Sequence, residues 1–178
     1  NGNPIKFIYA SGPNDFKYKD HGILNPIVID NTGIWRDENG LGRHINGGAN
    51  KVILTAPGKD NIKNIVFGVN DSELKDSDLI ISAASCTTNA IVPVLKLIND
   101  KYKITSGHIE TVHSYTNDQN LIDNYHSGDR RGRSAALNMV ITSTGAVTAV
   151  AKAIPELKGV LTGNAIRVPT PNVSLAVM

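Results

Sequence analysis

The chain has 178 residues, of which 40% are hydrophobic and 19% are charged, and its formal net charge is +2. These values are ordinary for a soluble globular protein, and they give no global electrostatic argument for a nucleic-acid or membrane partner. The single cysteine, Cys86, excludes an internal disulfide framework and fits a reducing compartment, so we expect a cytoplasmic protein.

Short branched or aromatic runs, each bounded by Gly, Pro, Asn or Asp, recur through residues 1–85. They predict strands at 5–9, 27–30, 52–55, 65–69 and 79–81, with room for helices at 36–47 and 71–76. Alternation of this kind predicts an α/β fold that is built on a parallel sheet.

Two turns of small residues follow predicted strands and contain Thr32, Gly33 and Thr55. Open α/β sheets bind nucleotides at the carboxyl ends of their strands, although such turns are also common as simple strand endings. The Gly-x-Gly-x-x-Gly fingerprint of dinucleotide binding is absent from the sequence. Gly40-Leu41-Gly42 has Ile45 where the third glycine should stand, and we interpret this segment as an ordinary glycine-rich loop.

The stretch 78–100 changes from a strand pattern to a helix pattern. An apolar run at 79–81 predicts a buried strand, and small polar residues follow it. Pro93 is expected near the start of the helix, where its missing N–H costs nothing, and Cys86 is expected at the turn into the helix. Apolar residues then recur at helical spacing, at Ile91, Val94, Leu95 and Ile98.

Cys86 is therefore a candidate nucleophile. Thiols at helix N-termini or beside a cationic histidine have lowered pKa values, but a helix end alone lowers a pKa by less than about 1.5 units, so a second cation is needed. The plainer alternative for Cys86 is a small buried hydrophobic residue. His113 shares one face of a predicted strand with Ile109, Thr111 and Tyr115, where a histidine is often only hydrogen-bonded in place.

Basic and hydroxyl residues later in the chain suit an anion. The loop 118–136 contains Arg130, Arg131 and Arg133, which form either a solvated surface or arginine forks for phosphate. Ser143-Thr144-Gly145 opens a second predicted helix, whose N-terminal N–H groups form a ready anion site. Arg167 lies on the apolar strand 165–168 and requires a partner for its charge.

Five motifs, in this order and spacing, carry a resemblance to a known family: Ser85-Cys86-Thr87-Thr88-Asn89, Thr111-Val112-His113, Arg130-Arg131, Ser143-Thr144-Gly145-Ala146 and Arg167-Val168-Pro169-Thr170. From about Gly22 onward the chain resembles glyceraldehyde-3-phosphate dehydrogenase. The resemblance implies that residues 1–85 are the C-terminal part of an NAD-binding, Rossmann-type domain and that residues 86–178 are part of an α+β catalytic domain. It also implies a central fragment, with the glycine-rich motif expected before Asn1 and further catalytic-domain elements expected after Met178.

The resemblance implies a role for each matching residue. Cys86 would be the nucleophile and His113 its base, because an imidazolium beside a thiolate stabilises both. The substrate would be a phosphorylated aldehyde, oxidised with NAD as the cofactor, and inorganic phosphate would split the resulting thioester. The predicted cofactor contacts are Thr32, Gly33 and Thr55, and no metal is expected. The substrate's phosphate would be held by Thr116 and Arg167, and the inorganic phosphate by Ser85, Thr87, Thr144 and Gly145, with Arg131 reaching between the two groups.

Several departures from the family pattern leave alternatives open. Asn124-Tyr125 stands where strictly NAD-dependent members commonly have Leu-Pro, so NADP is not excluded. Asp118 replaces a common threonine near the anion site, where a carboxylate repels phosphate unless an arginine pairs with it. Other short sequence motifs resemble erythrose-4-phosphate dehydrogenase. Two further functions also remain open, a Cys–His hydrolase and a catalytically silent binding or structural fragment. The resemblance to the family also implies a homotetramer.

Overall fold

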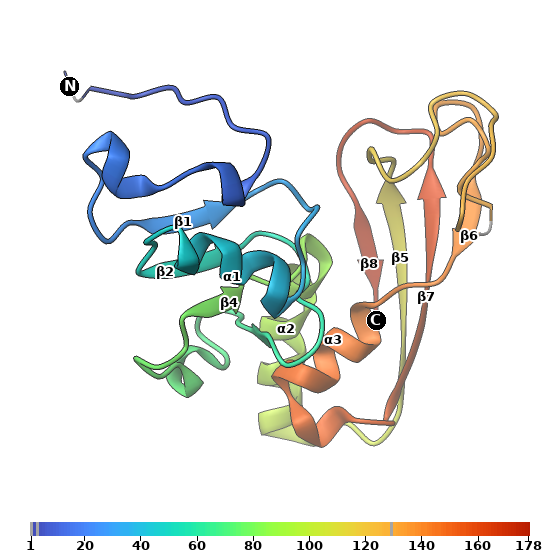
Figure 1. Cartoon of the computed structure of the whole chain (residues 1–178). Coiled ribbons are helices and arrows are strands. Elements are labelled where there is room, and N and C mark those ends of the chain that lie inside the picture. The colour runs from blue at the N-terminus through green and yellow to red at the C-terminus, as the bar shows by residue number, and fades with distance from the viewer. Residues whose placement is uncertain (1, 3, 129) are drawn as a thin grey trace. The chain divides into compact units, whose positions relative to one another are not determined.

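The computed structural model describes residues 2, 4–128 and 130–178. Asn1 and Asn3, from the stretch expected to follow the glycine-rich motif, lie outside the described residues, as does Asp129 of the predicted basic loop. The chain divides into two compact units, Asn1–Ser85 and Cys86–Met178 (Figure 1). Cys86 is thus the first residue of the second unit.

A four-stranded parallel sheet forms the centre of the first unit, in the order β1-β2-β4-β3. Helix α1 (Glu38–Asn46) packs on this sheet, and its Leu41 is completely buried against Val52 and Leu54 of β2. The strands are β1 (Ile27–Asp30), β2 (Lys51–Leu54), β3 (Lys63–Asn64) and β4 (Ile80–Ser82). Three short 3₁₀ helices complete the unit: η1 (Pro13–Asp15), η2 (Tyr18–His21) and η3 (Asp71–Glu73).

Helix α1 begins at a conventional cap. The Asp37 side chain accepts a hydrogen bond of 2.7 Å from the backbone N–H of Gly40, as an N-cap residue does. Gly40 and Gly42 therefore lie inside a helix, and the predicted glycine-rich loop is wrong. A Cβ atom at position 40 would lie 2.9 Å from the Cβ of Trp35, so this glycine permits the close approach of that side chain.

Two of the predicted strands are also wrong. Residues 5–9 pair with no strand among the described residues, and Ile5, Phe7 and Tyr9 are all largely exposed. Their apolar pattern resembles a strand, but a strand needs a hydrogen-bonded neighbour. In the predicted strand 65–69, the backbone N–H of Val66 donates to the side chain of Asn70, which closes a turn. The observed strand, β3, is only two residues long and ends before this turn.

The second unit contains a mixed four-stranded sheet in the order β6-β7-β5-β8. The two central strands, β5 and β7, are parallel, and their register places His113 opposite Arg167. The two outer strands run antiparallel to their neighbours. The strands are β5 (Gly107–Ser114), β6 (Val140–Thr142), β7 (Leu161–Val168) and β8 (Leu175–Val177).

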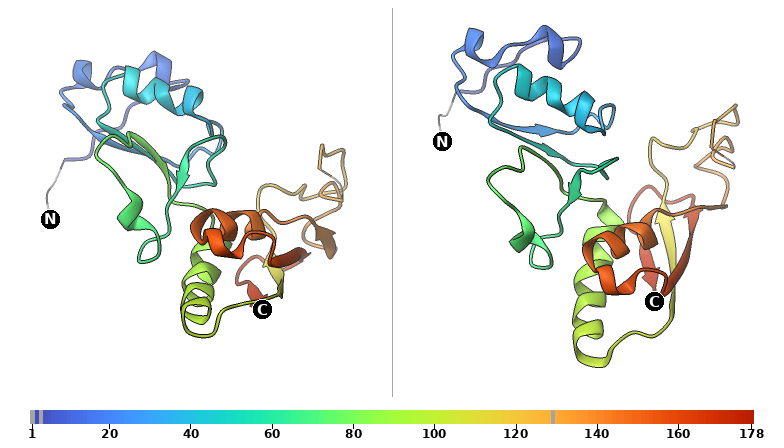
Figure 2. Two further views of the ribbon diagram at one scale, coloured as in Figure 1. Left: turned by 90° about the horizontal axis from the view of Figure 1, so that it is seen from below. Right: turned by 60° about the horizontal axis from the view of Figure 1, so that its bottom comes forward.

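Two helices, α2 (Cys86–Tyr102) and α3 (Ala146–Ala153), pack side by side on one face of this sheet (Figure 2). The buried residues recur at helical spacing in the helices and at every second position in β5 and β6. The most buried side chains are at most 4% exposed and include Ile91, Val92 and Leu95 of α2, Val150 of α3 and Ile109 of β5. A 3₁₀ helix, η4 (Pro155–Leu157), follows α3. No described helix is long and apolar enough to span a membrane.

Pro93 lies inside α2 rather than near its start, because the helix already begins at Cys86. Its ring nitrogen cannot donate the hydrogen bond that this position would otherwise make one turn back, so the expectation of a cost-free position is wrong. The predicted loop 118–136 contains no helix or strand among its described residues. It belongs to the segment 115–139, which projects beyond the carboxyl ends of β5 and β7 (Figure 1).

Candidate active site

The start of α2 and the end of β5 bring Cys86 and His113 together. Cys86 Sγ lies 3.7 Å from His113 Nε2, which is within hydrogen-bonding reach for sulfur. Cys86 is exposed, so its interpretation as a small buried hydrophobic residue is wrong. His113 is half-buried and faces the helix side of the sheet with Ile109 and Thr111. The arrangement presents a thiol to solvent with an imidazole nitrogen beside it.

The other ring nitrogen of His113 fixes its tautomer. His113 Nδ1 lies 2.6 Å from the carbonyl oxygen of Ser114, and an imidazole nitrogen at this distance from an acceptor carries the proton. Neutral His113 therefore presents an unprotonated Nε2 to the thiol of Cys86. A base in this form can take the thiol proton, and the resulting imidazolium then stands beside the thiolate.

Arg167 approaches the same carbonyl from the neighbouring strand. Its Nη1 donates to Ser114 O at 3.0 Å and to Thr116 Oγ1 at 3.3 Å, and it lies 3.0 Å from His113 Nδ1. A guanidinium has only donors, so its protons point to the two oxygens while Nδ1 keeps its own. The partner that the sequence requires for Arg167 is thus a carbonyl and a hydroxyl rather than a carboxylate.

Two arginine charges act on one another at this site. Burial lowers the pKa of Arg167, and the positive charge of Arg131 lowers it further, whereas Cys86 acts in the opposite direction. Like charges that influence each other in this way favour an anion between or beside them. Arg131 also forms an ion pair with Asp118, whose carboxylate therefore has the arginine partner that an acidic residue near a phosphate requires.

The remaining predicted phosphate contacts are less directly placed. Thr87 Oγ1 lies 4.0 Å from Cys86 Sγ. Gly145 is the N-cap of α3, and Thr144 Oγ1 accepts a hydrogen bond from Ala146 N at 3.1 Å, so both residues shape the start of that helix. Ser85 is the last residue of the first unit. The roles of these four residues in holding phosphate stay predictions.

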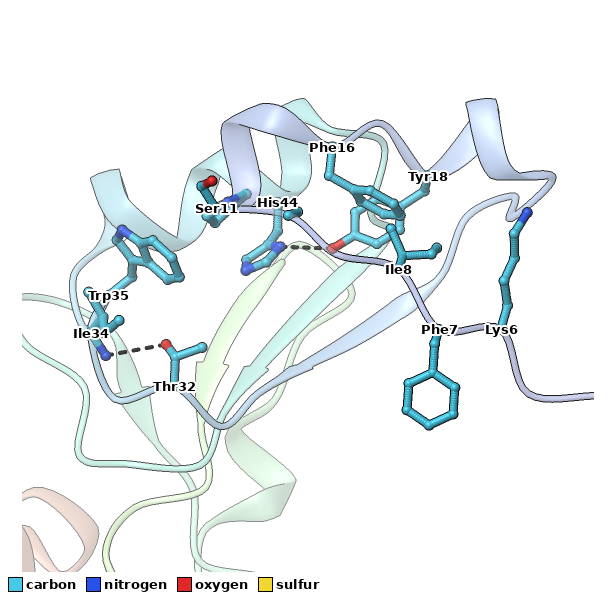
Figure 3. A pocket seen from close by; sticks show the side chains of 13 residues that line it. Lys6, Phe7, Ile8, Ser11, Phe16, Tyr18, Thr32, Ile34, Trp35 and His44 are labelled. Atoms are coloured by element: carbon cyan, nitrogen blue, oxygen red, sulfur yellow. Dashed lines mark hydrogen bonds between the residues drawn. The ribbon is translucent and has the colours of Figure 1, made fainter. Parts of the chain in front are cut away.

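The predicted cofactor contacts belong to the first unit, where a cavity of about 570 Å³ opens beside β1 (Figure 3). Thr32 lines this cavity together with Trp35 and Phe16, whereas Gly33 and Thr55 are not among its described lining residues. Thr55 Oγ1 instead donates to the Asp30 carbonyl at 3.2 Å. The aromatic walls suit a flat base, so this unit fits part of a nucleotide cofactor.

Sequence reasoning missed a chain of polar side chains that begins on the wall of that cavity. Tyr18 Oη lies 2.8 Å from His44 Nδ1, and Figure 3 draws this hydrogen bond as a dashed line. His44 Nε2 lies 3.3 Å from the buried carboxylate of Asp30. Burial and the charge of Asp30 both raise the pKa of Tyr18. The concentration of aromatic residues at 16–18 and at 35 was the available signal, but nothing local links these segments to each other.

No cluster of three or more His, Cys, Asp or Glu side chains suited to a metal ion occurs in the described part of the chain.

Residues 85–178 match the family model described as glyceraldehyde 3-phosphate dehydrogenase, C-terminal domain. The chain belongs to the glyceraldehyde-3-phosphate dehydrogenase family. The second unit, with its mixed sheet and paired helices, corresponds to the C-terminal domain of that family.

Individual members of the family are similar along the whole chain. A glyceraldehyde-3-phosphate dehydrogenase-like protein of Pseudomonas aeruginosa is 65% identical over all of this chain and 39% of its own length. The chloroplastic glyceraldehyde-3-phosphate dehydrogenase GAPA1 of Arabidopsis thaliana is 49% identical over 98% of the chain and 43% of its own length. The enzyme of Clostridium pasteurianum is 43% identical over 98% of the chain and 52% of its own length. The chain thus spans roughly two-fifths to half of these curated relatives.

Proposed function

We propose that the chain carries the reaction centre of a phosphorylating, NAD-dependent glyceraldehyde-3-phosphate dehydrogenase. The observation that carries this proposal is the 3.7 Å approach of Cys86 Sγ to His113 Nε2 in a chain that belongs to this family. The names of the relatives support a triose phosphate, rather than erythrose 4-phosphate, as the aldehyde. The chemistry needs Cys86 as a free thiol, which suits the reducing compartment that the sequence predicts.

Cys86 and His113 carry the covalent steps. His113 Nε2 accepts the thiol proton, and Cys86 Sγ attacks the aldehyde carbon. The imidazolium then returns that proton to the former aldehyde oxygen, which gives a thiohemiacetal whose oxygen is stabilised by Cys86 N–H and by His113. His113 then takes the hydroxyl proton of the thiohemiacetal as the carbon loses a hydride, which leaves a thioester on Cys86. Attack by inorganic phosphate releases the acyl phosphate and restores the thiolate.

The hydroxyls and arginines around this pair would orient the two anions. Arg167 and Thr116, already joined by a hydrogen bond of 3.3 Å, form one predicted subsite for the substrate's own phosphate. Thr87, beside Cys86, belongs to the predicted subsite for the attacking phosphate, and Arg131 reaches between them. Arginine forks bind phosphate oxygens in pairs, so they fix orientation as well as charge.

NAD would supply the hydride acceptor when bound, and NADP is the alternative. The first unit would hold part of it through Thr32, with Gly33 and Thr55 as further predicted contacts. The aromatic cavity beside Thr32 supports this assignment because Trp35 and Phe16 offer flat apolar surfaces. A parallel sheet with a helix packed on it, as observed in the first unit, supports its assignment to a nucleotide-binding domain.

A homotetramer is part of the same proposal. On the sheet face away from α2 and α3, four apolar side chains stand in one row across all four strands, because the register pairs Ile141 with Ile166, Ile166 with Val112, and Val112 with Leu175. Ile141 and Leu175 are 54% and 60% exposed. A contiguous apolar row of this kind supports self-association. Sedimentation of an Ile166→Lys variant would show smaller species if the row is an interface.

The test of the proposed function uses the complete protein with Cys86→Ser and His113→Asn substitutions. Both variants should lose aldehyde oxidation by about 10²-fold or more. His108→Asn is a matched control, since His108 lies on the same strand but is exposed and bonded to Thr162 and Asn164. Activity within a few-fold of the parent in either variant would remove the assignment. Turnover with triose and erythrose phosphates, each with and without inorganic phosphate, distinguishes the related reactions.

A further inference from the structure

A cavity of about 490 Å³ lies beside β6 in the second unit, and we call it the β6 cavity. Residues of the segment 115–139 and of the segment 141–143 form its walls, and Cys86 and His113 are not among its described lining residues. It is therefore separate from the thiol and imidazole of the candidate active site. The polar and charged side chains on its walls include Asp118, His126, Arg130, Arg131, Thr142 and Ser143.

Thr142 is the first sign that this cavity receives a ligand. The residue is only 6% exposed, yet its hydroxyl has no hydrogen-bond partner among the described residues. Leaving a buried hydroxyl unsatisfied is costly, so buried polar side chains in folded proteins normally have a partner. Thr142 lines the cavity, and its hydroxyl can therefore be satisfied by a polar group bound there.

His126 contributes a second donor. The backbone N–H of Gly128 donates to His126 Nδ1 at 2.8 Å, so Nδ1 acts as an acceptor and the ring proton resides on Nε2. Neutral His126 thus offers Nε2–H as a donor that the local turn does not consume. The exposed hydroxyl of Ser143 lies on the same cavity wall and can donate as well.

The charges on the described walls favour an anion. Two guanidinium groups, Arg130 and Arg131, face one carboxylate, Asp118, which already pairs with Arg131. Arg130 Nη1 donates to the carbonyl oxygen of Ile141 at 3.2 Å, which ties this arginine to β6 next to Thr142. An oxyanion here would meet a guanidinium and a ring N–H from the loop and a hydroxyl from β6, whereas a water molecule would leave the excess positive charge uncompensated.

We propose that the β6 cavity binds a phosphate group, of inorganic phosphate or of a phosphate ester, through Arg130, Thr142 and His126. This site goes beyond the proposed dehydrogenase reaction and does not depend on it. Arg131 lines the cavity and is also a predicted contact of the reacting phosphate, so an anion in the cavity would share one charged wall with that site. Arg130 and Thr142 line the cavity and are not among the predicted contacts of the reacting phosphates, so they are the residues to change.

The experiment measures phosphate binding to the purified protein by titration calorimetry, in an Arg167→Met, Thr87→Val background that weakens both predicted phosphate subsites of the reaction site. Thr142→Val keeps the side-chain shape and removes a hydroxyl that stabilises nothing in the folded chain. Arg130→Asn removes the guanidinium, and asparagine tolerates the left-handed backbone at this position, where φ is 67°. Arg133→Asn is the control, because Arg133 lies on the same loop, pairs with Asp123 and does not line the cavity.

Thr142→Val and Arg130→Asn should each weaken binding by about tenfold or more, whereas Arg133→Asn should leave it unchanged. Titration with inorganic phosphate and with glycerol 3-phosphate separates the two sources of the phosphate group, and binding of either that the cavity variants weaken supports the site. The proposal is overturned if neither probe binds, or if both cavity variants bind as tightly as their parent. The experiment measures binding and not turnover. Its outcome is therefore independent of whether Cys86 and His113 carry the proposed reaction.

Discussion

Arg167 and His113 stand at one register position of the parallel strands β5 and β7, with Arg167 Nη1 3.0 Å from His113 Nδ1. Both side chains converge on the carbonyl oxygen of Ser114. The sheet thereby fixes the imidazole in the form that turns an unprotonated Nε2 towards Cys86. Arg167 is thus a positioning residue for His113 as well as a predicted phosphate contact.

Replacing Arg167 should therefore both lower kcat and raise KM for the aldehyde. Arg167→Met should lower kcat/KM for the aldehyde by about 10²-fold, because both the phosphate contact and the support of His113 are lost. Arg167→Lys keeps the charge but not the fork, and should recover only part of the loss. Steady-state kinetics of the complete protein measure both, with Arg133→Met as a surface control. An unchanged kcat together with a raised KM would restrict Arg167 to binding.

His113 should also control the reactivity of Cys86 in the absence of substrate. His113→Asn removes the base 3.7 Å from Sγ, so alkylation of the chain's single cysteine by iodoacetamide at neutral pH should slow by about tenfold. Intact-mass measurement over time follows the reaction without needing cofactor or substrate. His108→Asn should alkylate at the parental rate. Equal rates in all three proteins would show that the two side chains do not interact in solution.

Local patterns predict much of the second unit correctly. The helical spacing of Ile91 and Leu95 places α2, and the alternation around Ile109 places β5, because these periods are properties of a single element. The predictions fail where the local structure depends on a group outside the predicted element. Residues 5–9 lack a pairing strand, and the side chain of Asn70 closes a turn where a strand is predicted.

The candidate site divides in the same way. Motif resemblance predicts Cys86 and His113 as a pair, and the geometry agrees. The opposition of His113 and Arg167 depends on strand register between segments far apart in sequence, which no local pattern encodes. The unsatisfied hydroxyl of Thr142 and the aromatic cavity at Trp35 likewise follow only from tertiary packing.

Asp78 links the stability of the first unit to pH. Its carboxylate accepts a 2.6 Å hydrogen bond from Lys63 Nζ and one of 2.8 Å from Lys75 N, and these contacts hold its pKa below the usual range. The stabilisation is present above the ordinary aspartate pKa of about 3.9 and is lost as the pH falls through the lower folded-state value. Asp78→Asn should therefore destabilise the protein at neutral pH, and its deficit should shrink on acidification.

Urea unfolding of parent and Asp78→Asn proteins, from neutral pH down to the lowest pH at which both remain folded, checks this dependence. Asp100→Asn is the control for loss of one carboxylate, because Asp100 forms an exposed pair with Lys96 within one helix. A deficit in Asp78→Asn that stays constant across the titration would mean that the charge of Asp78 is not the stabilising feature.

The pairing of Asp118 with Arg131 should restrain phosphate use. The carboxylate neutralises a guanidinium that the proposed reaction needs for its incoming anion, so phosphate must compete with it. Asp118→Asn removes the negative charge and should lower the KM for inorganic phosphate by about threefold, as expected for a half-exposed ion pair. Asp123→Asn, which breaks the neighbouring pair with Arg133 on the same loop, should leave that KM unchanged. A raised KM in Asp118→Asn would instead show that the carboxylate holds Arg131 in its productive position.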